Sequence, residues 1–379
     1  MKKTQEVKHK MAIMKLILAG FLALGQILSP VGAWITNFGE AAFFDDWSAE
    51  DEFTKDSYVE IPKTPGEDFI VLNLADVQLD DDEMFDTLGE ESMALVAKLI
   101  EDTKPDLITL SGDNAWGTIT YLEIIKLVDS YDIPWGAVMG NHDGQGCISE
   151  FWAAYHLAEA ENSVFKFGPE GMGYGNYVIN ITENGNIIHS IYMMDTHNNR
   201  EYETDNGTIG GYDHLWDNQK EWYKWCVKGT NALAGYPVMS TVIMHIPVYE
   251  YYDAWHAVGM DIDEANNKLG VINPLCYGIA SGRRGEYGGH PPVNNGFFEL
   301  CRELGSTKDM IVGHDHDNDY SILYKGIRLT YAVKTGRGCY YTEDMLGATT
   351  LSINSLGIAT VHQNYYSQNA DGAWAKIVK

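Results

Sequence analysis

The chain has 379 residues, enough for one large domain, and 45% of them are hydrophobic, which excludes a disordered protein. Its 54 acidic residues outnumber its 26 basic ones and give a net charge of −28, so the surface as a whole repels nucleic acids and anionic membranes. An anionic substrate needs local positive charge at its site, and bound metal ions can supply that charge.

The first 33 residues have the pattern of a secretory signal peptide. Lysines within the first ten residues precede an apolar run at 16–28, and small residues at 31–33 suit cleavage. The alternative is an uncleaved anchor, but Lys15, Gln26 and Pro30 interrupt the roughly 20 apolar residues that a span requires. We therefore expect a secreted or extracytoplasmic protein, membrane-anchored only if the signal is retained.

The cysteines are scattered along the chain without any CxxC pair, which excludes a cysteine zinc finger and a dense disulfide framework. One or two disulfides remain compatible with an exported protein. The five are Cys147, Cys226, Cys276, Cys301 and Cys339.

Residues 34–65 are acidic and aromatic, and we expect them to form a lead-in segment with one strand near 58–61. The catalytic domain is predicted to cover 66–379. From residue 69 on, apolar runs that end in polar clusters alternate with segments of helical periodicity, such as 93–102 and 121–131, which predicts an α/β domain. The runs expected to be strands lie at 69–76, 106–114, 134–143, 187–197, 238–247 and 310–319.

The C-terminal part has a different pattern. The segments 327–335, 348–356 and 358–366 read as consecutive strands with turns between them, so the sheet is expected to finish with an antiparallel section.

Short polar segments follow the predicted strands and carry oxygen and imidazole ligands. Functional residues of α/β sheets gather at strand ends, and donors without thiolates suit Zn, Mn or Fe. A carboxylate such as Asp113 can bridge two cations, and a pair about 3.5–4 Å apart can hold a hydroxide nucleophile and the ester oxygens together. The segments are LADVQ (Asp76, Gln78), SGDN (Asp113, Asn114), GNHD (Asn141, His142, Asp143), MHIP (His245) and GHDHDND (His314, His316).

This ordered set resembles the calcineurin-like metallophosphoesterase superfamily, whose pattern is D-x-H, G-D, G-N-H-D/E, a lone His and G-H-x-H, over roughly residues 66–340. The resemblance is closest to the purple-acid-phosphatase-like branch of plants and fungi. The supporting segments are GDN at 112–114, DNQKEWYKW at 217–225, NNGFFE at 294–299, GHDHDND at 313–319 and KTGRGCYY at 334–341.

The resemblance implies a β-sandwich of two mixed sheets flanked by helices, in α/β/β/α layers, and two divalent or trivalent metal ions. It assigns the first ion to Asp76 and His316, with Asp113 bridging. It assigns the second ion to Asn141, His245 and His314. His142 protonates the leaving alkoxide and Asp143 orients His142, a role that suits a carboxylate beside an imidazole.

Two positions depart from the family pattern. Gln78 stands where most members have a histidine ligand, so we expect a weaker, neutral ligand to the first metal. Trp116 stands where purple acid phosphatases have a metal-binding tyrosine, so no tyrosinate–iron colour is expected. Outside the motifs, Arg283 and Arg284 could clamp a phosphate bidentately, with a solvated loop as the alternative.

The sequence thus predicts a phosphomonoesterase that uses attack by a metal-bound hydroxide on a phosphate ester. Phosphodiester hydrolysis at the same site and a non-catalytic surface protein on this fold are the alternatives. A β-lactamase-like metallohydrolase is disfavoured because the H-x-H pair comes last and the final histidine of H-x-H-x-D-H is missing. No nucleic-acid binding, membrane contact beyond the leader, or protein partner is predicted.

Overall fold

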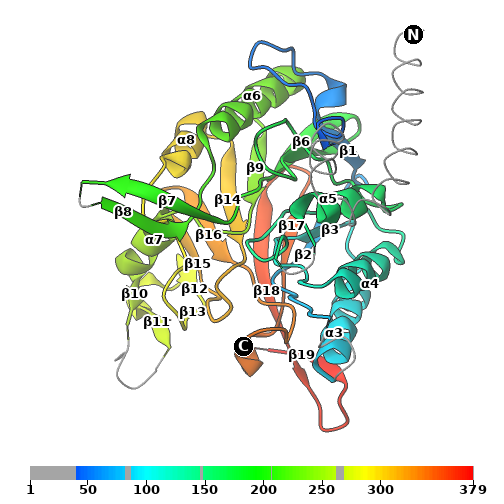
Figure 1. Cartoon of the computed structure of the whole chain (residues 1–379), viewed down its shortest axis with the longest axis vertical. Coiled ribbons are helices and arrows are strands. Elements are labelled where there is room, and N and C mark those ends of the chain that lie inside the picture. Colours follow the sequence, from blue (N-terminus) through cyan, green and yellow to red (C-terminus); the bar gives the residue numbers. More distant parts are fainter. Residues whose placement is uncertain (1–39, 82–86, 146–147, 206, 262–268, 379) are drawn as a thin grey trace, which may run out of the picture.

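The computed structural model describes residues 40–81, 87–145, 148–205, 207–261 and 269–378. Two β-sheets pack face to face, and a layer of helices covers the outer face of each (Figure 1). This is the predicted α/β/β/α arrangement, and the fold prediction is confirmed. The predicted signal peptide and Cys147 lie outside the described residues.

The first sheet is mixed and has eight strands, with a run of parallel neighbours β6-β9-β14-β16 at its centre. Its spatial order is β1 (Val59–Pro62), β5 (Tyr177–Glu183), β6 (Asn186–Met193), β9 (Met239–Ile243), β14 (Thr307–Val312), β16 (Ile327–Tyr331), β15 (Ser321–Tyr324) and β12 (Ala280–Ser281).

The second sheet has six strands, three of them antiparallel at one side and three parallel at the other. Its order is β19 (Trp374–Ile377), β18 (Ala359–Gln368), β17 (Gly347–Ile353), β2 (Phe69–Leu74), β3 (Leu107–Leu110) and β4 (Trp135–Ala137). The expected antiparallel finish is therefore present in β17 to β19. The strand predicted at 327–335 is not part of it, because β16 pairs in parallel with β14 in the other sheet.

The helices divide between the two outer faces (Figure 1). Those beside the second sheet are α3 (Thr87–Thr103), α4 (Thr118–Asp129) and α5 (Glu150–Glu159). Those beside the first sheet are α6 (Asp217–Ala234), α7 (Glu250–Val258) and α8 (Phe297–Leu304). Short 3-10 turns lie at η2 (Lys55–Ser57), η4 (Pro274–Cys276) and η5 (Glu343–Met345).

Two small sheets were not predicted. A ribbon of β7 (Asn199–Thr204) and β8 (Gly207–Tyr212) projects from the body (Figure 1). The other joins β10 (Gly259–Met260), β11 (Gly270–Ile272) and β13 (Arg283–Arg284).

The central strands of the first sheet are mostly buried along their length because both of their faces are covered. On β6, Ile191 packs into the core between the two sheets. The next residue, Tyr192, packs into the core beneath α6 and α8. Since side chains alternate across a strand, a sheet covered on both faces needs a continuous apolar run rather than an alternating one.

The acidic segment before residue 66 belongs to the folded domain. β1 adds to the edge of the first sheet beside β5, and Phe43 packs against Phe151 and Phe167. Residues on both sides of position 66 thus pack together, and the domain boundary there stays a prediction. The four cysteines that the structure describes are free thiols. Among the described residues, none of the helices combines the length and apolar character of a membrane span.

β14 also carries a buried carboxyl group whose ionisation opposes folding. Burial raises the pKa of Asp309 from 3.8 to about 7, although Arg328 and Lys308 act in the opposite direction. A raised carboxyl pKa favours the folded state while the group is protonated, and this contribution is lost as the pH rises through about 7.

We compare the free energy of unfolding of Asp309→Asn with that of the native chain. The difference in favour of the variant should be about 2 kcal/mol larger at pH 8.5 than at pH 5. This is the scale of a pKa shift of this size, discounted for the slight exposure of the group. Urea unfolding at the two pH values measures the difference. A difference between the two chains that does not vary with pH would contradict this reading.

Candidate active site

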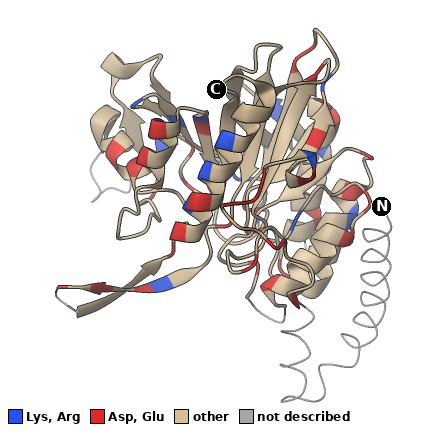
Figure 2. Ribbon diagram, turned by 90° about the horizontal axis from the view of Figure 1, so that it is seen from above, with Lys and Arg blue, Asp and Glu red and all other residues tan. Residues whose placement is uncertain are grey.

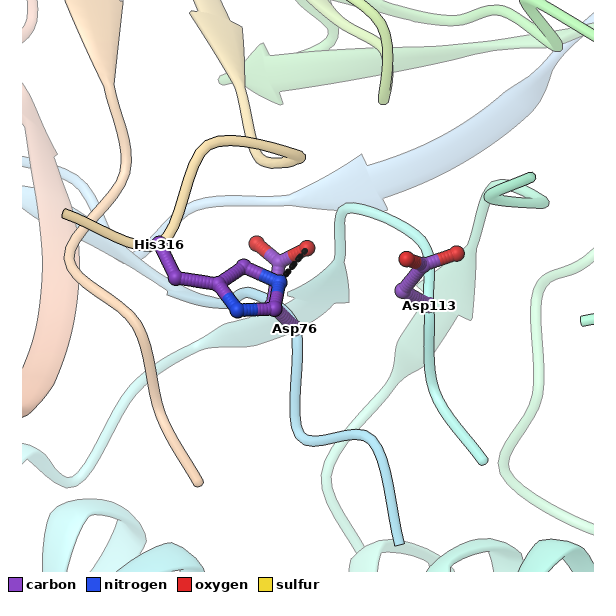
Figure 3. A group of neighbouring side chains, drawn as sticks. All are labelled: Asp76, Asp113 and His316. Carbon is purple, nitrogen blue, oxygen red and sulfur yellow. Dashed lines mark ion pairs between the residues drawn. The ribbon is translucent and has the colours of Figure 1, made fainter. Parts of the chain in front are cut away.

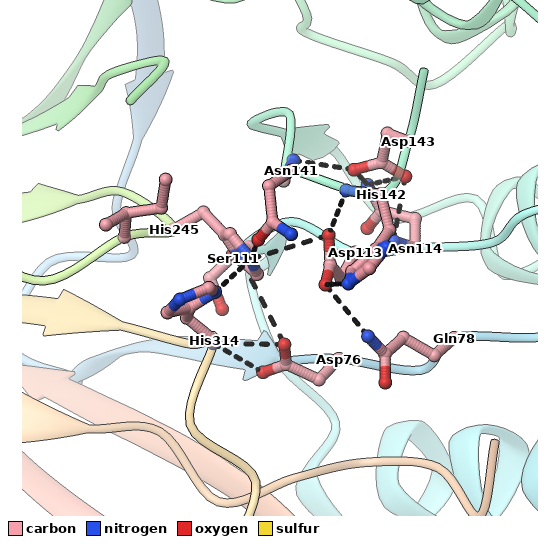
Figure 4. A network of polar contacts seen from close by, with 12 residues as sticks. Asp76, Gln78, Ser111, Asp113, Asn114, Asn141, His142, Asp143, His245 and His314 are labelled. Carbon is pink, nitrogen blue, oxygen red and sulfur yellow. Dashed lines mark hydrogen bonds and ion pairs between the residues drawn. The ribbon is translucent and has the colours of Figure 1, made fainter. Parts of the chain in front are cut away.

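The predicted site residues come together where parallel strands of both sheets end. Asp76 follows β2, Asp113 follows β3 and Asn141 follows β4 in the second sheet, while His245 follows β9 and His314 follows β14 in the first. Carboxyl ends of parallel strands meet at one edge of a sheet, and the sandwich brings the two edges together. Figure 4 shows these side chains pointing toward a common centre.

One group of ligand atoms surrounds His245. Its Nε2 lies 3.0 Å from Oδ1 of Asn141, 3.3 Å from Nδ1 of His314 and 3.4 Å from Oδ1 of Asp113 (Figure 4). Ligands that share one tetrahedral cation at about 2.0–2.1 Å are about 3.4 Å from one another. Asn141, His314 and Asp113 thus each place one ligand atom at 3.0–3.4 Å from Nε2 of His245.

A second group consists of Asp76, Asp113 and His316, whose ligand atoms all lie within 4.8 Å of one another (Figure 3). Nε2 of His316 is 3.7 Å from Oδ1 of Asp76. Both oxygens of Asp76 also accept from the backbone N–H of His314, at 3.0 and 3.1 Å, which orients the carboxylate. Asp113 belongs to both groups, as its predicted bridging role requires.

Backbone carbonyls orient the imidazoles that face the two groups. Nδ1 of His245 lies 2.9 Å from the carbonyl of Ser111, and Nδ1 of His316 lies 2.9 Å from the carbonyl of Tyr340. A carbonyl only accepts, so each Nδ1 carries the proton and each Nε2 keeps its lone pair for a cation.

Aromatic rings surround the same imidazoles. Tyr340 stacks on His316 at 4.2 Å between ring centroids, and Tyr212 of β8 meets His314 edge-on at 4.3 Å. Trp116 lies 5.0 Å from the ring of His142, so the position that holds a metal-binding tyrosine in the family packs here against the predicted acid. These ring contacts restrict how the imidazoles can turn.

The backbone is strained where it delivers the ligands. Asp76, Gln78, Asp113 and His314 have φ angles of 52°, 48°, 50° and 78°. Such left-handed conformations cost non-glycine residues about 1–2 kcal/mol each. Their concentration at one place indicates that the surrounding structure holds these turns for a functional reason.

Charge coupling makes this cluster attract cations. Burial disfavours both charges, but the attraction between Asp113 and His245 raises the pKa of His245 to about 10 and lowers that of Asp113. A metal ion that binds between this carboxylate and this imidazole has to displace that proton.

Gly112 permits the approach of His245. Its φ is 92°, and a Cβ at this position would lie 2.6 Å from Nδ1 of His245. We expect Gly112→Ala to weaken zinc binding by about tenfold or more, as for other changes that displace a metal ligand.

Gly171→Ala is the matched control, because Gly171 also has a positive φ, 76°, but nothing lies within 4 Å of its added Cβ. Both variants bear the same backbone strain, so calorimetric zinc titration of the two isolates the displacement of His245. Equal zinc affinities in the two variants would show that the approach at Gly112 is unimportant.

His142 is placed at the open side of the cluster. Its side chain is 32% exposed, and its Nε2 lies 3.9 Å from Oδ2 of Asp113. Its Nδ1 lies 2.7 Å from Oε1 of Gln145, and its backbone N–H donates to Oδ1 of Asp113 at 2.8 Å. The ring is thus held next to the cluster with Nε2 directed at it.

The role predicted for Asp143 is corrected. Its carboxylate accepts from the backbone N–H groups of Gly140 and Asn114, at 2.7 and 2.8 Å, and from the side chain of Asn114. It therefore ties the GNHD turn to the SGDN turn, while Gln145 makes the contact with His142. Adjacent residues on a tight turn point in different directions, so sequence neighbourhood is a poor guide to contact.

The ligand role predicted for Gln78 is also corrected. Its Nε2 donates to Oδ2 of Asp113 at 2.8 Å, and its Oε1 accepts from Nζ of Lys334 at 3.1 Å. The amide thus presents N–H groups, not a ligand oxygen, to the bridging carboxylate.

The two predicted phosphate-binding arginines are paired with carboxylates. Arg283 contacts Asp344 at 2.8 Å and Asp319 at 3.4 Å, while Arg284 contacts Asp261 at 3.0 Å. These ion pairs favour a structural role, and phosphate binding by either guanidinium stays a prediction.

Sequence reasoning missed Gln145, Lys334 and Tyr340 as site residues. The GNHD motif ends two residues before Gln145, and no spacing rule connects them. The KTGRGCYY segment contains both Lys334 and Tyr340 and had been noted only as part of the resemblance. That segment was the sequence signal by which Lys334 and Tyr340 could have been found.

Comparison with known proteins agrees with this geometry. The model of the calcineurin-like phosphoesterase family matches residues 71–318. The "Probable inactive purple acid phosphatase 14" of Arabidopsis thaliana is 27% identical over 270 residues, which cover 64% of this chain and 61% of that protein. "Phosphatase DCR2" of Saccharomyces cerevisiae is 26% identical over 243 residues, 60% of this chain and 38% of that protein. The chain thus spans about three fifths, or less, of the length of these relatives.

Among solved structures, a dimetal phosphatase from Danio rerio aligns with a TM-score of 0.44 and 12% identity, over 78% of this chain and 98% of that one. The family match extends from β2, which leads to Asp76, through the turn that carries His314 and His316. The chain belongs to the calcineurin-like phosphoesterase family, with purple-acid-phosphatase-like relatives.

Proposed function

We propose that this protein is a metal-dependent hydrolase of phosphate monoesters. The observation that carries the proposal is the group around His245, in which Asn141, His314 and Asp113 place ligand atoms 3.0–3.4 Å from one imidazole nitrogen. Cations bound there supply Lewis acidity and lower the pKa of a bound water to about 7.

The residues of the chain have distinct parts in this reaction. Asp113 and Asp76 provide the negative charge that retains cations in a buried site. His142 is the general acid: in its imidazolium form Nδ1–H donates to Oε1 of Gln145, and Nε2–H faces the leaving oxygen. The aromatic rings of Trp116, Tyr212 and Tyr340 limit water around the imidazoles.

The charge of the protein makes cations essential for substrate binding. Acidic positions are spread over the helices and loops of both outer layers (Figure 2), and the net charge is −28. Lys334 and Arg283 are both engaged by groups of the chain itself. A phosphate dianion therefore depends on the metal centre for its attraction to the site.

Turnover of p-nitrophenyl phosphate tests the proposal, with bis-p-nitrophenyl phosphate as the diester comparison. After removal of metals by a chelator and reloading with Zn²⁺ or Mn²⁺, we expect metal-dependent release of p-nitrophenol, faster from the monoester. Faster release from the diester would support a phosphodiesterase instead.

A second candidate is a metal-binding protein on this fold without turnover. It is favoured by the Gln78 amide and the Lys334 ammonium beside the first cation position, and the name of the Arabidopsis relative describes that protein as probably inactive. Metal binding without hydrolysis of either ester would select this candidate. An extracytoplasmic location is also part of our proposal, and N-terminal sequencing of the exported protein tests it.

A further inference from the structure

A lysine lies beneath the first cation position. Lys334 is 2% exposed, and its Nζ donates to the backbone oxygen of Asp76 at 2.7 Å and to Oε1 of Gln78 at 3.1 Å. Lysine is almost never so buried without partners that fix its ammonium. The backbone of Lys334 bridges Ala75 at the end of β2 and Leu346 before β17, so the side chain starts from a rigid position in the second sheet.

The ammonium determines which way the Gln78 amide faces. An ammonium has no acceptor, so the group that meets Nζ of Lys334 must be the amide oxygen. The amide nitrogen then faces Oδ2 of Asp113, at 2.8 Å. Lys334 thus contacts Gln78. Gln78 in turn contacts the carboxylate that both cation positions share (Figure 4).

The two cation positions are consequently unequal. At the position around His245, amide, imidazole and carboxylate ligand atoms lie 3.0–3.4 Å from its Nε2. The position at Asp76 and His316 lacks the histidine that the family places at residue 78, and one oxygen of Asp113 already accepts from Gln78. A fixed positive charge two hydrogen bonds away repels a further cation there.

We propose that Lys334 is a positioning residue that orients Gln78 and Asp113, and that the chain binds one divalent cation tightly at Asp113, Asn141, His245 and His314 and a second one at least tenfold more weakly at Asp76 and His316. This inference rests on the metal centre of the proposed function, but not on the reaction. It distinguishes this chain from an enzyme with two equivalent metal positions.

Titration of the metal-free full chain with Zn²⁺ in a calorimeter tests the proposal, and Co²⁺ absorption in the visible range reports the geometry of each bound ion. We expect two binding steps in the native chain, with dissociation constants that differ tenfold or more. In Lys334→Met the two constants should approach each other. In the double variant Gln78→His with Lys334→Met, which restores an imidazole and removes the ammonium, they should agree within about threefold, since such neighbouring groups change metal affinity about 10–100-fold.

Lys126→Met is the matched control. It also removes a lysine charge, but Lys126 pairs with Glu123 on the surface of α4, so the separation of the two steps should stay as in the native chain. An unchanged affinity for the first equivalent in each variant shows that the fold is intact. If Lys334→Met does not fold, Gln78→His alone replaces it, and the second step should still become tighter.

Two equally tight steps in the native chain would overturn the proposal, as would an unchanged second step in every variant at Gln78 and Lys334. Binding of no cation at all would overturn it together with the proposed function. The titrations contain no substrate, so the two proposals can fail separately. If one cation binds tightly but no ester is hydrolysed, only the proposed function is refuted. If two cations bind equally tightly and an ester is hydrolysed, only this inference is refuted.

Discussion

Replacing Asp113 by asparagine is expected to remove bound metal and to lower phosphomonoester turnover by about a hundred- to a thousandfold, the scale seen when a charged group that stabilises the transition state is lost. The carboxylate accepts from Gln78 and from the backbone of His142, both at 2.8 Å, and lies 3.4 Å from Nε2 of His245. An amide at this position is neutral, and its NH₂ group would face one of these donors. Both cation positions therefore lose their shared ligand.

Elemental analysis after dialysis measures the metal content, and p-nitrophenyl phosphate measures the turnover. Asp309→Asn is the control, because Asp309 is also a buried carboxyl group but lies within β14, away from the strand-end turns. It should retain the native metal content. Full metal content and turnover in Asp113→Asn would mean that Asp113 does not bridge cations.

Replacing His142 by alanine is expected to leave the metal content unchanged and to lower turnover by about a hundred- to ten-thousandfold, the usual contribution of a general acid. The side chain is not in the tight group around His245: its Nε2 is 3.9 Å from the nearer Asp113 oxygen. The loss should be larger for an alkyl phosphate than for p-nitrophenyl phosphate, because a poor leaving group needs the proton more.

Gln145→Ala is the companion variant, since it removes only the acceptor of Nδ1 of His142 and should cause a smaller loss of about tenfold. Elemental analysis and turnover of the two esters show whether His142 is a metal ligand or the general acid. Loss of metal in His142→Ala would identify His142 as a ligand. An equal loss for both leaving groups would show that it is not the acid.

The number of metal ions affects how both results are interpreted. If one cation is bound tightly and one weakly, turnover should depend on free metal concentration well above that needed to fill the first position. Asp113→Asn then affects two binding steps of different strength. Measuring metal content and activity on the same samples keeps these effects apart.

Sequence reasoning alone predicted the fold class, most of the strands that carry the site, and the groups that lie around His245. Each ligand follows a short apolar run rich in β-branched and aliphatic residues, and this pattern favours a buried strand with the ligand at its end. Family resemblance then brought Asp76, Asp113, Asn141, His245 and His314 to one centre, and the geometry agrees.

The neighbours of these groups, by contrast, could be identified only from the folded structure. Gln145, not Asp143, contacts His142, because the turn directs adjacent side chains to opposite sides. Lys334 lies 256 residues from Gln78 in the chain but holds its amide, because backbone bridges place Lys334 beside Ala75 after β2 and Leu346 before β17. Hydrogen bonds of this kind depend on the distance and direction between atoms of separate segments, and those quantities exist only once the two sheets have packed together.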